Sequence, residues 1–253
     1  LYPDVYLGRL ACRNFFDVKI MVNKIINYEK EKSDESWFKN LILVAGDSYP
    51  NNNSVPPVQI NEGELISEKA ITLMPDFNPV RVYAREGEDI NRETVNAAMD
   101  KGAGFAYFCG HGSAASWSTH FPPDGKKWTT GYTYQDMTYL KNKEKLPIVV
   151  VGGCHNGQFD VTLLNLLDPN RGYFTAITKC WSWKLTSKMG GGAIATIANT
   201  GLGTHGDGDM DNNSIADYIE ILDGWLELRF LELYGKEGKD ILGENHADTL
   251  TGY

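Results

Sequence analysis

Short apolar runs alternate with helical patterns along most of this sequence. The apolar, β-branched runs lie at 41–46, 80–84, 104–110, 147–153 and 192–198. The segments with helical spacing lie before, between and after them, at 17–31, 63–74, 92–102 and 214–235. Strands that alternate with helices form parallel sheets covered on both faces, because each crossover helix packs against the sheet. The pattern therefore predicts an α/β fold with a mainly parallel central sheet.

The charge balance restricts the partners of the chain. Its 253 residues carry a net charge of -9, and no stripe of Lys and Arg is present. Such a chain lacks the cationic surface that displaces counterions from a phosphate backbone, so we expect no nucleic acid partner. No apolar run approaches the roughly 18 residues of a membrane span, so we expect none. The first residues also lack the charged and apolar regions of a signal peptide.

No linker or internal repeat divides the chain, so we expect one domain over residues 1–253. Because residue 1 is Leu rather than Met, we expect this domain to be a fragment of a larger precursor. The cysteines are too few and too scattered for a disulfide framework, and none has a C-x-x-C spacing that would indicate zinc. Among them, Cys109 and Cys180 are expected to pack in the core. The sequence does not indicate the oligomeric state.

A histidine and a cysteine each follow one of the apolar runs. His111 comes directly after 104–110, and Cys154 after 147–153. Sites in parallel sheets form where loops leave the carboxyl ends of the strands, so both side chains should share one edge of the sheet. Two long loops rich in Pro, Asn, Ser, Thr and Gly, 48–61 and 114–133, suit substrate binding at that edge.

Gly110 and Gly112 flank His111 and let other backbone approach closely. Gly152 and Gly153 precede Cys154, and the Asn-Gly pair at 156–157 behind it indicates a tight turn. A cysteine attacks a carbonyl as the thiolate, and a neighbouring imidazole takes its proton or keeps it ionised. The backbone N–H groups of Gly112 and Cys154 are then candidates for an oxyanion hole. The alternative for Cys154 is a buried core cysteine, which would not need Gly152 and Gly153 before it. We therefore interpret Cys154 as a nucleophile and His111 as its proton-transfer partner.

The motifs that carry these residues resemble those of a known family. The segments GHGS at 110–113 and GGCHNGQFD at 152–160 resemble the His-Gly and Ala/Gly-Cys motifs of the gingipains. Further segments at 3–14, 25–30, 41–47 and 191–201 resemble gingipain sequence in the same order. The resemblance implies a caspase-like three-layer α/β/α sandwich. It also implies a cysteine endopeptidase that cleaves protein or peptide substrates through a thioester acyl-enzyme.

Other site residues follow from the same resemblance. An acidic residue of the family assists the histidine, and the matching position is Asp47, although Asp47 also suits a turn cap with Ser48. A preference for Arg or Lys before the scissile bond implies a carboxylate further along. The nearest are Glu62 and Glu64, which equally suit the first turn of a helix. The remaining expected substrate-binding residues are Gly153, Thr200, Gly201 and Leu202.

An acidic loop follows the last apolar run. It carries Asp207, Asp209 and Asp211 at alternate positions, a spacing that presents oxygen ligands to Ca²⁺. Asn212 and Tyr218 stand where an EF-hand has Gly and Glu, so the loop is not an EF-hand. The two interpretations are a structural calcium site and a solvated acidic loop. We expect no metal or organic cofactor in catalysis.

Three other functions remain open. The chain could be an inactive relative that serves as an interaction module, although the intact Cys and His oppose this. It could be a peptide ligase or transpeptidase, because an amine can intercept the same thioester. It could also be a metal-binding module centred on 207–213. The family resemblance further implies a secreted or envelope-associated enzyme made as a zymogen.

Overall fold

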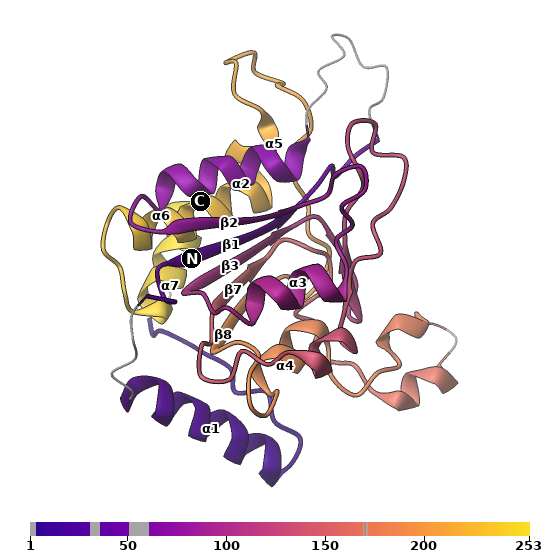
Figure 1. Ribbon diagram of the computed structural model, residues 1–253, viewed down its shortest axis with the longest axis vertical. Helices are drawn as coiled ribbons and strands as arrows, with labels where there is room; N and C mark the ends of the chain where they lie inside the picture. The colour runs from indigo at the N-terminus through magenta and orange to yellow at the C-terminus, as the bar shows by residue number, and fades with distance from the viewer. Residues whose placement is uncertain (1–3, 31–35, 51–60, 169, 171) are drawn as a thin grey trace.

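The computed structural model describes residues 4–30, 36–50, 61–168, 170 and 172–253. Its centre is a five-stranded sheet in the order β2-β1-β3-β7-β8 (Figure 1). Every pairing in this sheet is parallel. The strands are β1 (Asn40–Ala45), β2 (Asn78–Tyr83), β3 (Phe105–Cys109), β7 (Ile148–Val151) and β8 (Ala195–Ala198). Each coincides with one of the predicted apolar runs, so the α/β prediction is confirmed.

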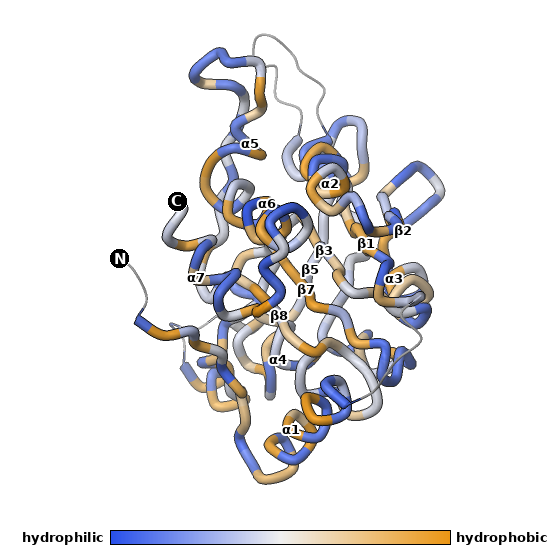
Figure 2. The backbone as a smooth tube through the Cα atoms, turned by 90° about the vertical axis from the view of Figure 1, so that its left-hand side faces the viewer, coloured by the Kyte–Doolittle hydropathy of each residue, from blue (hydrophilic) through white to orange (hydrophobic). Residues whose placement is uncertain are grey.

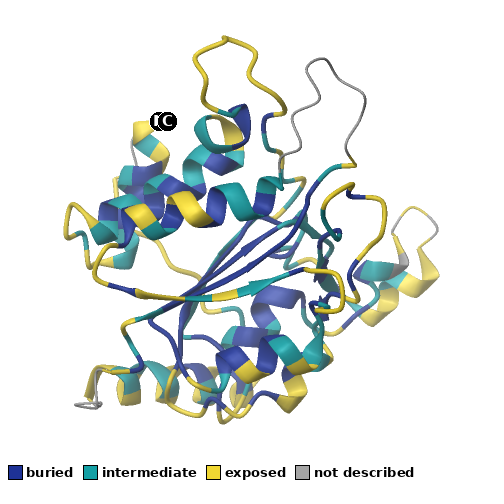
Figure 3. Ribbon diagram, turned by 45° about the horizontal axis from the view of Figure 1, so that its top comes forward, coloured by how far each residue is buried: buried dark blue, intermediate teal, exposed yellow. Residues whose placement is uncertain are grey.

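Helices cover both faces of this sheet (Figures 1 and 3). One layer contains α2 (Glu62–Leu73), α5 (Asp217–Glu220), α6 (Leu222–Gly235) and α7 (Leu242–Gly252). The other contains α3 (Arg92–Met99) and α4 (Trp181–Thr186), with α1 (Phe15–Lys30) beside α4. The result is the expected three-layer α/β/α sandwich. Within the described ranges, no helix is both long and apolar enough to cross a membrane.

The sheet separates two hydrophobic cores because successive side chains of a strand point to opposite faces. On β1, Ile42 and Val44 pack in the core on the side of α3, while Leu41 and Leu43 pack in the core on the side of α2 and α6. Figure 3 shows these strands buried between the helical layers, and Figure 2 shows the hydrophobic residues of β7 and β8 in the interior. The central strands are therefore rigid supports for the loops at their carboxyl ends.

Two predicted segments differ from the structure. The helical pattern at 214–235 is two helices, α5 and α6, because Ile221 is extended and Leu222 has a φ of 56°. Leu222 is held there by an antiparallel bridge with His205, which interrupts the helix. The predicted loop 114–133 contains two short strands, β5 (Ser116–Ser118) and β6 (Tyr132–Thr133), which form an antiparallel sheet with β4 (His111–Gly112). Of the other predicted loop, residues 51–60 lie outside the described residues.

Candidate active site

Strands β3 and β7 carry His111 and Cys154 to the same edge of the sheet. The two strands pair in parallel with Phe108 opposite Val151. His111 and Cys154 each lie three positions beyond that pair (111 − 108 = 3 and 154 − 151 = 3). Both residues are half-buried. The topology therefore places the predicted cysteine and histidine at the same edge of the sheet, from segments far apart in the chain.

The backbones around these two residues are in contact. A Cβ on Gly153 would lie 2.9 Å from Gly112 Cα and 3.0 Å from Gly112 N. A Cβ on Gly112 would lie 2.8 Å from the carbonyl oxygen of Cys154. Real Cβ atoms do not tolerate such contacts against backbone, so glycine is required at both positions. The glycines thus allow two segments to lie side by side. One is the turn at 152–157 that holds the predicted nucleophile Cys154, called the nucleophile turn below, and the other is the strand β4 that holds His111.

Asn156 fastens the same two segments together. Its side chain is fully buried, and Nδ2 donates to the carbonyls of Ser113 at 2.8 Å and Ser116 at 3.0 Å. These carbonyls belong to the loop that follows His111. The role of Asn156 was not predicted, because the N-G pair behind Cys154 indicated only a turn.

The segment 199–203 runs beside the nucleophile turn. The backbone N–H of Gly203 donates to Cys154 Sγ at 3.3 Å, and the thiol lies 3.4 Å from the Gly203 carbonyl. The N–H of His155 donates to the carbonyl of Gly201 at 2.6 Å. Leu202 is 78% exposed, and Thr200 is also exposed. The structure therefore brings the expected pocket wall next to Cys154.

The imidazole of His111 is held by backbone and by aromatic rings. Its Nε2 donates to the carbonyl of Ser48. Its ring meets those of Tyr49, His120 and Trp128 edge to face, with centroids 5.8, 5.4 and 5.1 Å away. A proton on Nε2 leaves Nδ1 as the basic nitrogen of the neutral ring. No pattern in the sequence predicted this aromatic surround, because its members come from separate loops.

Asp47 does not contact His111 in this structure. Its side chain is fully buried, and among the described residues no donor reaches either carboxylate oxygen. Burial, reinforced by the carboxylate of Glu62, raises the pKa of Asp47 to about 8. The expected hydrogen bond from His111 is made instead to the neighbouring carbonyl of Ser48, because the backbone at 47 is fixed by pairing with His120.

The two glutamates of α2 already have partners within the protein. Glu62 Oε2 accepts from the N–H groups of Ser48 at 3.0 Å and Tyr49 at 3.4 Å. Glu64 forms a two-pronged ion pair with Arg85. Both residues lie in the first turn of α2, as the alternative interpretation had it. Glu62 therefore holds the loop behind His111, and both carboxylates have partners within the protein.

The sequence model of peptidase family C25 matches residues 1–244. The chain belongs to peptidase family C25. Among curated relatives, gingipain R2 of Porphyromonas gingivalis is 24% identical over 161 residues, covering 62% of this chain and 20% of that protein. Lys-gingipain of the same organism is 24% identical over 163 residues, covering 63% of this chain and 8% of that protein. The chain therefore spans a fifth or less of the length of these gingipains.

Solved structures agree with this assignment at the level of the fold. The complex of the pro- and mature domains of RgpB from Porphyromonas gingivalis matches with a TM-score of 0.62 and 18% identity, covering 99% of this chain and 51% of that one. The Arg-specific cysteine proteinase gingipain R matches with a TM-score of 0.58 and 18% identity, covering 98% of this chain and 53% of that one. The caspase-like sandwich implied by the sequence resemblance is thus confirmed.

A buried polar cluster underlies the active edge of this C25 family member. The hydroxyl of Tyr218 lies 2.7 Å from Ser48 Oγ and 3.2 Å from Cys109 Sγ. The ring of His205 stacks on that of Tyr218 with centroids 4.4 Å apart. Cys109 and Tyr218 are almost completely buried. The cluster therefore connects the loop that holds His111 to the interior beneath it.

Glu227 of α6 completes this cluster. Its Oε2 accepts from the hydroxyl of Tyr107 and lies 3.5 Å from His205 Nε2. Burial alone would lower the pKa of His205, but Glu227 and Cys109 outweigh it and raise that pKa to about 11. A Cβ on Gly152 would lie 2.2 Å from Glu227 Oε1, so Glu227 packs directly under the nucleophile turn.

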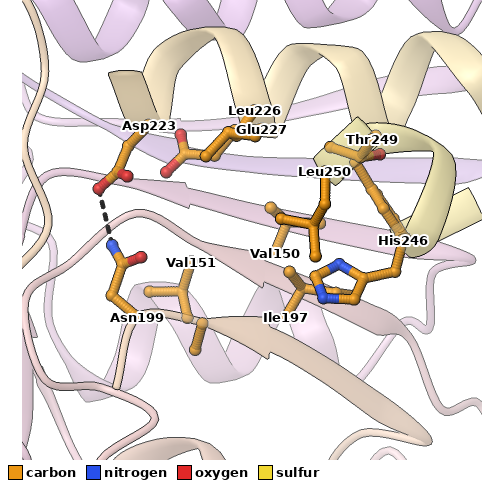
Figure 4. Close-up of a pocket in the computed structure, with 12 residues that line it drawn as sticks. Val150, Val151, Ile197, Asn199, Asp223, Leu226, Glu227, His246, Thr249 and Leu250 are labelled. Carbon is orange, nitrogen blue, oxygen red and sulfur yellow. Dashed lines mark hydrogen bonds between the residues drawn. The ribbon is translucent and has the colours of Figure 1, made fainter. Parts of the chain in front are cut away.

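A cavity of about 130 Å³ lies between the strands β7 and β8 and the helices α6 and α7 (Figure 4). Most of its wall is apolar, from Val150, Val151, Ile197, Leu226, Phe230 and Leu250. At the polar end Asn199 Nδ2 donates to Asp223 at 2.8 Å. Burial raises the pKa of Asp223, and Glu227 adds to the effect. The cavity thus adjoins both the pocket wall and the buried cluster.

The acidic loop gathers a different set of carboxylates from the predicted one. Ligand atoms of Asp209, Asp211 and Asp217 lie within 4.8 Å of one another, and Asp207 is not part of this group. Asp217 is buried at the start of α5, where its carboxylate also accepts from the N–H of Met210 at 3.2 Å. The loop folds back onto α5, which the alternating spacing alone could not reveal.

Proposed function

We propose that this chain is a cysteine endopeptidase that uses Cys154 as nucleophile and His111 as proton-transfer group. The observation that carries the proposal is the equivalent position of the two residues past paired strands, with Gly112 and Gly153 in backbone contact between them. A core cysteine would have no need of this arrangement. Membership of family C25 and similarity to gingipain R2 support the same activity.

The proposed reaction proceeds in two stages. His111 Nδ1 takes the proton of the Cys154 thiol, and the thiolate attacks the scissile carbonyl. The N–H groups of Gly112 and Cys154 stabilise the oxyanion, and His111 protonates the leaving amine. Water assisted by His111 then hydrolyses the thioester. The Ser48 carbonyl fixes the tautomer of His111, which leaves Nδ1 free for both transfers. Asp47 is not needed for this orientation.

We further propose a preference for Arg or Lys before the scissile bond. The support is the similarity to gingipain R2 and Lys-gingipain. Glu62 and Glu64 each have partners within the protein, so a substrate cation would share a carboxylate with them. Of the two, Glu62 contacts the loop beside His111, because its carboxylate accepts from the N–H of Tyr49, whose ring meets that of His111. Glu62 is therefore our candidate for that partner.

The test is hydrolysis of fluorogenic peptides with Arg, Lys, Asp, Asn or Leu before the scissile bond, under reducing conditions with and without calcium. Cys154→Ala and His111→Ala should both abolish turnover. Cys12→Ala, a half-buried thiol on another part of the chain, is the matched control and should retain turnover. Glu62→Gln should raise KM for Arg and Lys substrates, whereas Glu64→Gln should leave KM unchanged.

The alternatives predict different products. A ligase or transpeptidase would transfer the acyl group to an added amine in preference to water. Absence of any cleavage by the wild-type chain, including after limited proteolysis to remove inhibition as a zymogen, would refute the peptidase proposal and favour an interaction module. The expectation of a secreted or envelope-associated enzyme stays a prediction, which fractionation of the producing cells would test.

We also propose that Ca²⁺ stabilises the acidic loop. The carboxylates of Asp209, Asp211 and Asp217 converge, and Ca²⁺ prefers several oxygen ligands of this kind. Asp207 is left outside this set. The ion has no part in the reaction, and its effect would be on folding alone.

A further inference from the structure

We infer that Cys109, His205 and Glu227 form a binding site for a thiophilic divalent cation such as Zn²⁺. Their ligand atoms, a sulfur, an imidazole nitrogen and a carboxylate oxygen, all lie within 4.8 Å of one another. Sulfur, nitrogen and oxygen donors of these types make up zinc sites in proteins. This cluster lies beneath the catalytic edge and is separate from the acidic loop proposed for Ca²⁺.

The environment of the three side chains is that of a ligand set. Cys109 is fully buried, and the side chains of His205 and Glu227 are only 5% and 8% exposed. Among the described residues, the buried His205 Nε2 makes no hydrogen bond, and Glu227 Oε2 lies 3.5 Å from it. An unpartnered buried nitrogen is costly, so a ligand that occupies it lowers the free energy of the folded state.

The geometry requires only a small adjustment. Tetrahedral Zn²⁺ with bonds of roughly 2.0–2.3 Å places its ligand atoms about 3.5 Å apart. Since the three atoms lie within 4.8 Å of one another, they need to close by at most about 1.3 Å, within the freedom of side-chain torsions. The protein supplies three ligands, and the fourth position is left for water. Of the three, Glu227 also lines the cavity between β7, β8, α6 and α7 (Figure 4).

The surrounding hydroxyls act on the ligands themselves. Tyr107 donates to Glu227 Oε2, and the hydroxyl of Tyr218 lies 3.2 Å from Cys109 Sγ. Hydrogen bonds of this kind orient metal ligands and stabilise the charged thiolate and carboxylate. Without a cation, the alternative is an ion pair between a protonated His205 and Glu227. A cation would have to displace that proton, so the two states exclude each other.

A cation here would tie together the segments that carry the dyad. Cys109 lies two residues before His111, and His205 lies two residues after Gly203, which contacts Cys154 Sγ. Glu227 packs against Gly152, two residues before Cys154. Each ligand thus belongs to, or touches, a segment that positions the catalytic thiol or imidazole. A bound cation would therefore hold in place the segments that position Cys154 and His111.

The experiment uses the Cys154→Ala chain, so that the catalytic thiol cannot bind the metal and the result does not depend on peptidase activity. Zn²⁺ uptake is measured by equilibrium dialysis, and Co²⁺ is used as a second probe, because a cysteine ligand produces a thiolate charge-transfer absorption. We expect one equivalent of metal per chain and a rise in Tm on binding. Cys109→Ala and the isosteric Glu227→Gln should each weaken binding about 10-fold or more.

Two matched variants serve as controls. Cys180→Ala removes an equally buried thiol from a different core cluster, and Asp209→Asn alters the acidic loop. Both should bind Zn²⁺ as the parent does. Uptake of less than one equivalent by the parent, or equal binding by the Cys109→Ala and Cys180→Ala chains, would leave only the ion pair and overturn the inference. Circular dichroism of Glu227→Gln separates lost binding from lost folding.

Discussion

Replacing Asn156 with alanine would remove the side-chain hydrogen bonds that join the nucleophile turn to the loop that follows His111. Asn156 is fully buried, and its amide bridges to the carbonyls of Ser113 and Ser116. The two carbonyls are not equally dependent on it, because Ser116 also accepts from the N–H of Ser113. The substitution therefore leaves one carbonyl without a partner and another with one bond instead of two.

The size of the effect follows from these bonds. A buried acceptor without a partner costs about 1–3 kcal/mol, and an ordinary hydrogen bond contributes about 1 kcal/mol. We therefore expect Asn156→Ala to lower the free energy of unfolding by about 2–4 kcal/mol. For a chain of this size that lowers Tm by about 5–15 °C. Because a shift of about 1 Å between reacting groups can cost roughly 100-fold, kcat should fall by about that factor.

The matched control is Asn142→Ala. Asn142 is also buried and bridges backbone, with Nδ2 donating to the carbonyls of Lys145 and Gly192 and Oδ1 accepting from the N–H of Gly192. It precedes β7, at the end of the sheet opposite Cys154. We expect a similar loss of stability without a loss of kcat. Thermal unfolding gives the first quantity, and peptide hydrolysis well below either Tm, normalised to alkylatable Cys154, gives the second.

The reasoning would be refuted if the two variants lost kcat equally, since general destabilisation would then explain both. It would also be refuted if Asn156→Ala kept wild-type kcat, because the amide would then have no part in aligning the dyad. The rate of alkylation of Cys154 by iodoacetamide offers a readout that does not require turnover. It should change in Asn156→Ala and remain unchanged in Asn142→Ala.

Three further substitutions test other parts of the structure. Asp47→Asn should flatten the pH dependence of the free energy of unfolding. The pKa of Asp47 is raised to about 8 in the folded protein, so the wild type loses stability as the pH rises from about 4 to 8. Urea unfolding at pH 5 and pH 8 would measure this loss. Gly153→Ala should lower kcat by about 100-fold or more, because its Cβ would lie 3.0 Å from Gly112 N; unchanged peptide hydrolysis would contradict the contact. Added Ca²⁺ should raise the Tm of the wild type, and differential scanning calorimetry should find a smaller rise in Asp209→Asn.

Much of the fold could be predicted because its signal is local. The β1 run LILVAG and the β7 run PIVVVGG are apolar and bounded by turn residues, so strand positions agree to within one or two residues. Helix α2 was equally clear from its spacing. The break between α5 and α6 was not, because a bridge from His205 to Leu222 causes it. No property of the 214–235 segment itself encodes that contact.

In the candidate site, too, only the features with a local signal in the sequence could be predicted. His111 and Cys154 could be placed together because neighbouring parallel strands bring the residues after their carboxyl ends to one edge of the sheet. The hydrogen-bond partners of His111 and Cys154 could not be predicted, because they depend on the directions of side chains in loops. Asp47 comes directly after β1 as expected, yet its carboxylate points into the interior toward Glu62, and the carbonyl of Ser48 meets the imidazole instead.

That exchange of a carboxylate for a carbonyl alters what the histidine can do. A carbonyl orients the imidazole and fixes its tautomer, but it brings no negative charge to stabilise an imidazolium. The charge beneath the site instead belongs to Glu227, which contacts Gly152 and His205 rather than His111. Glu227 therefore pairs with the buried His205. We therefore expect residues outside the proposed dyad, in these backbone contacts and in this cluster, to govern the alignment of His111 and Cys154.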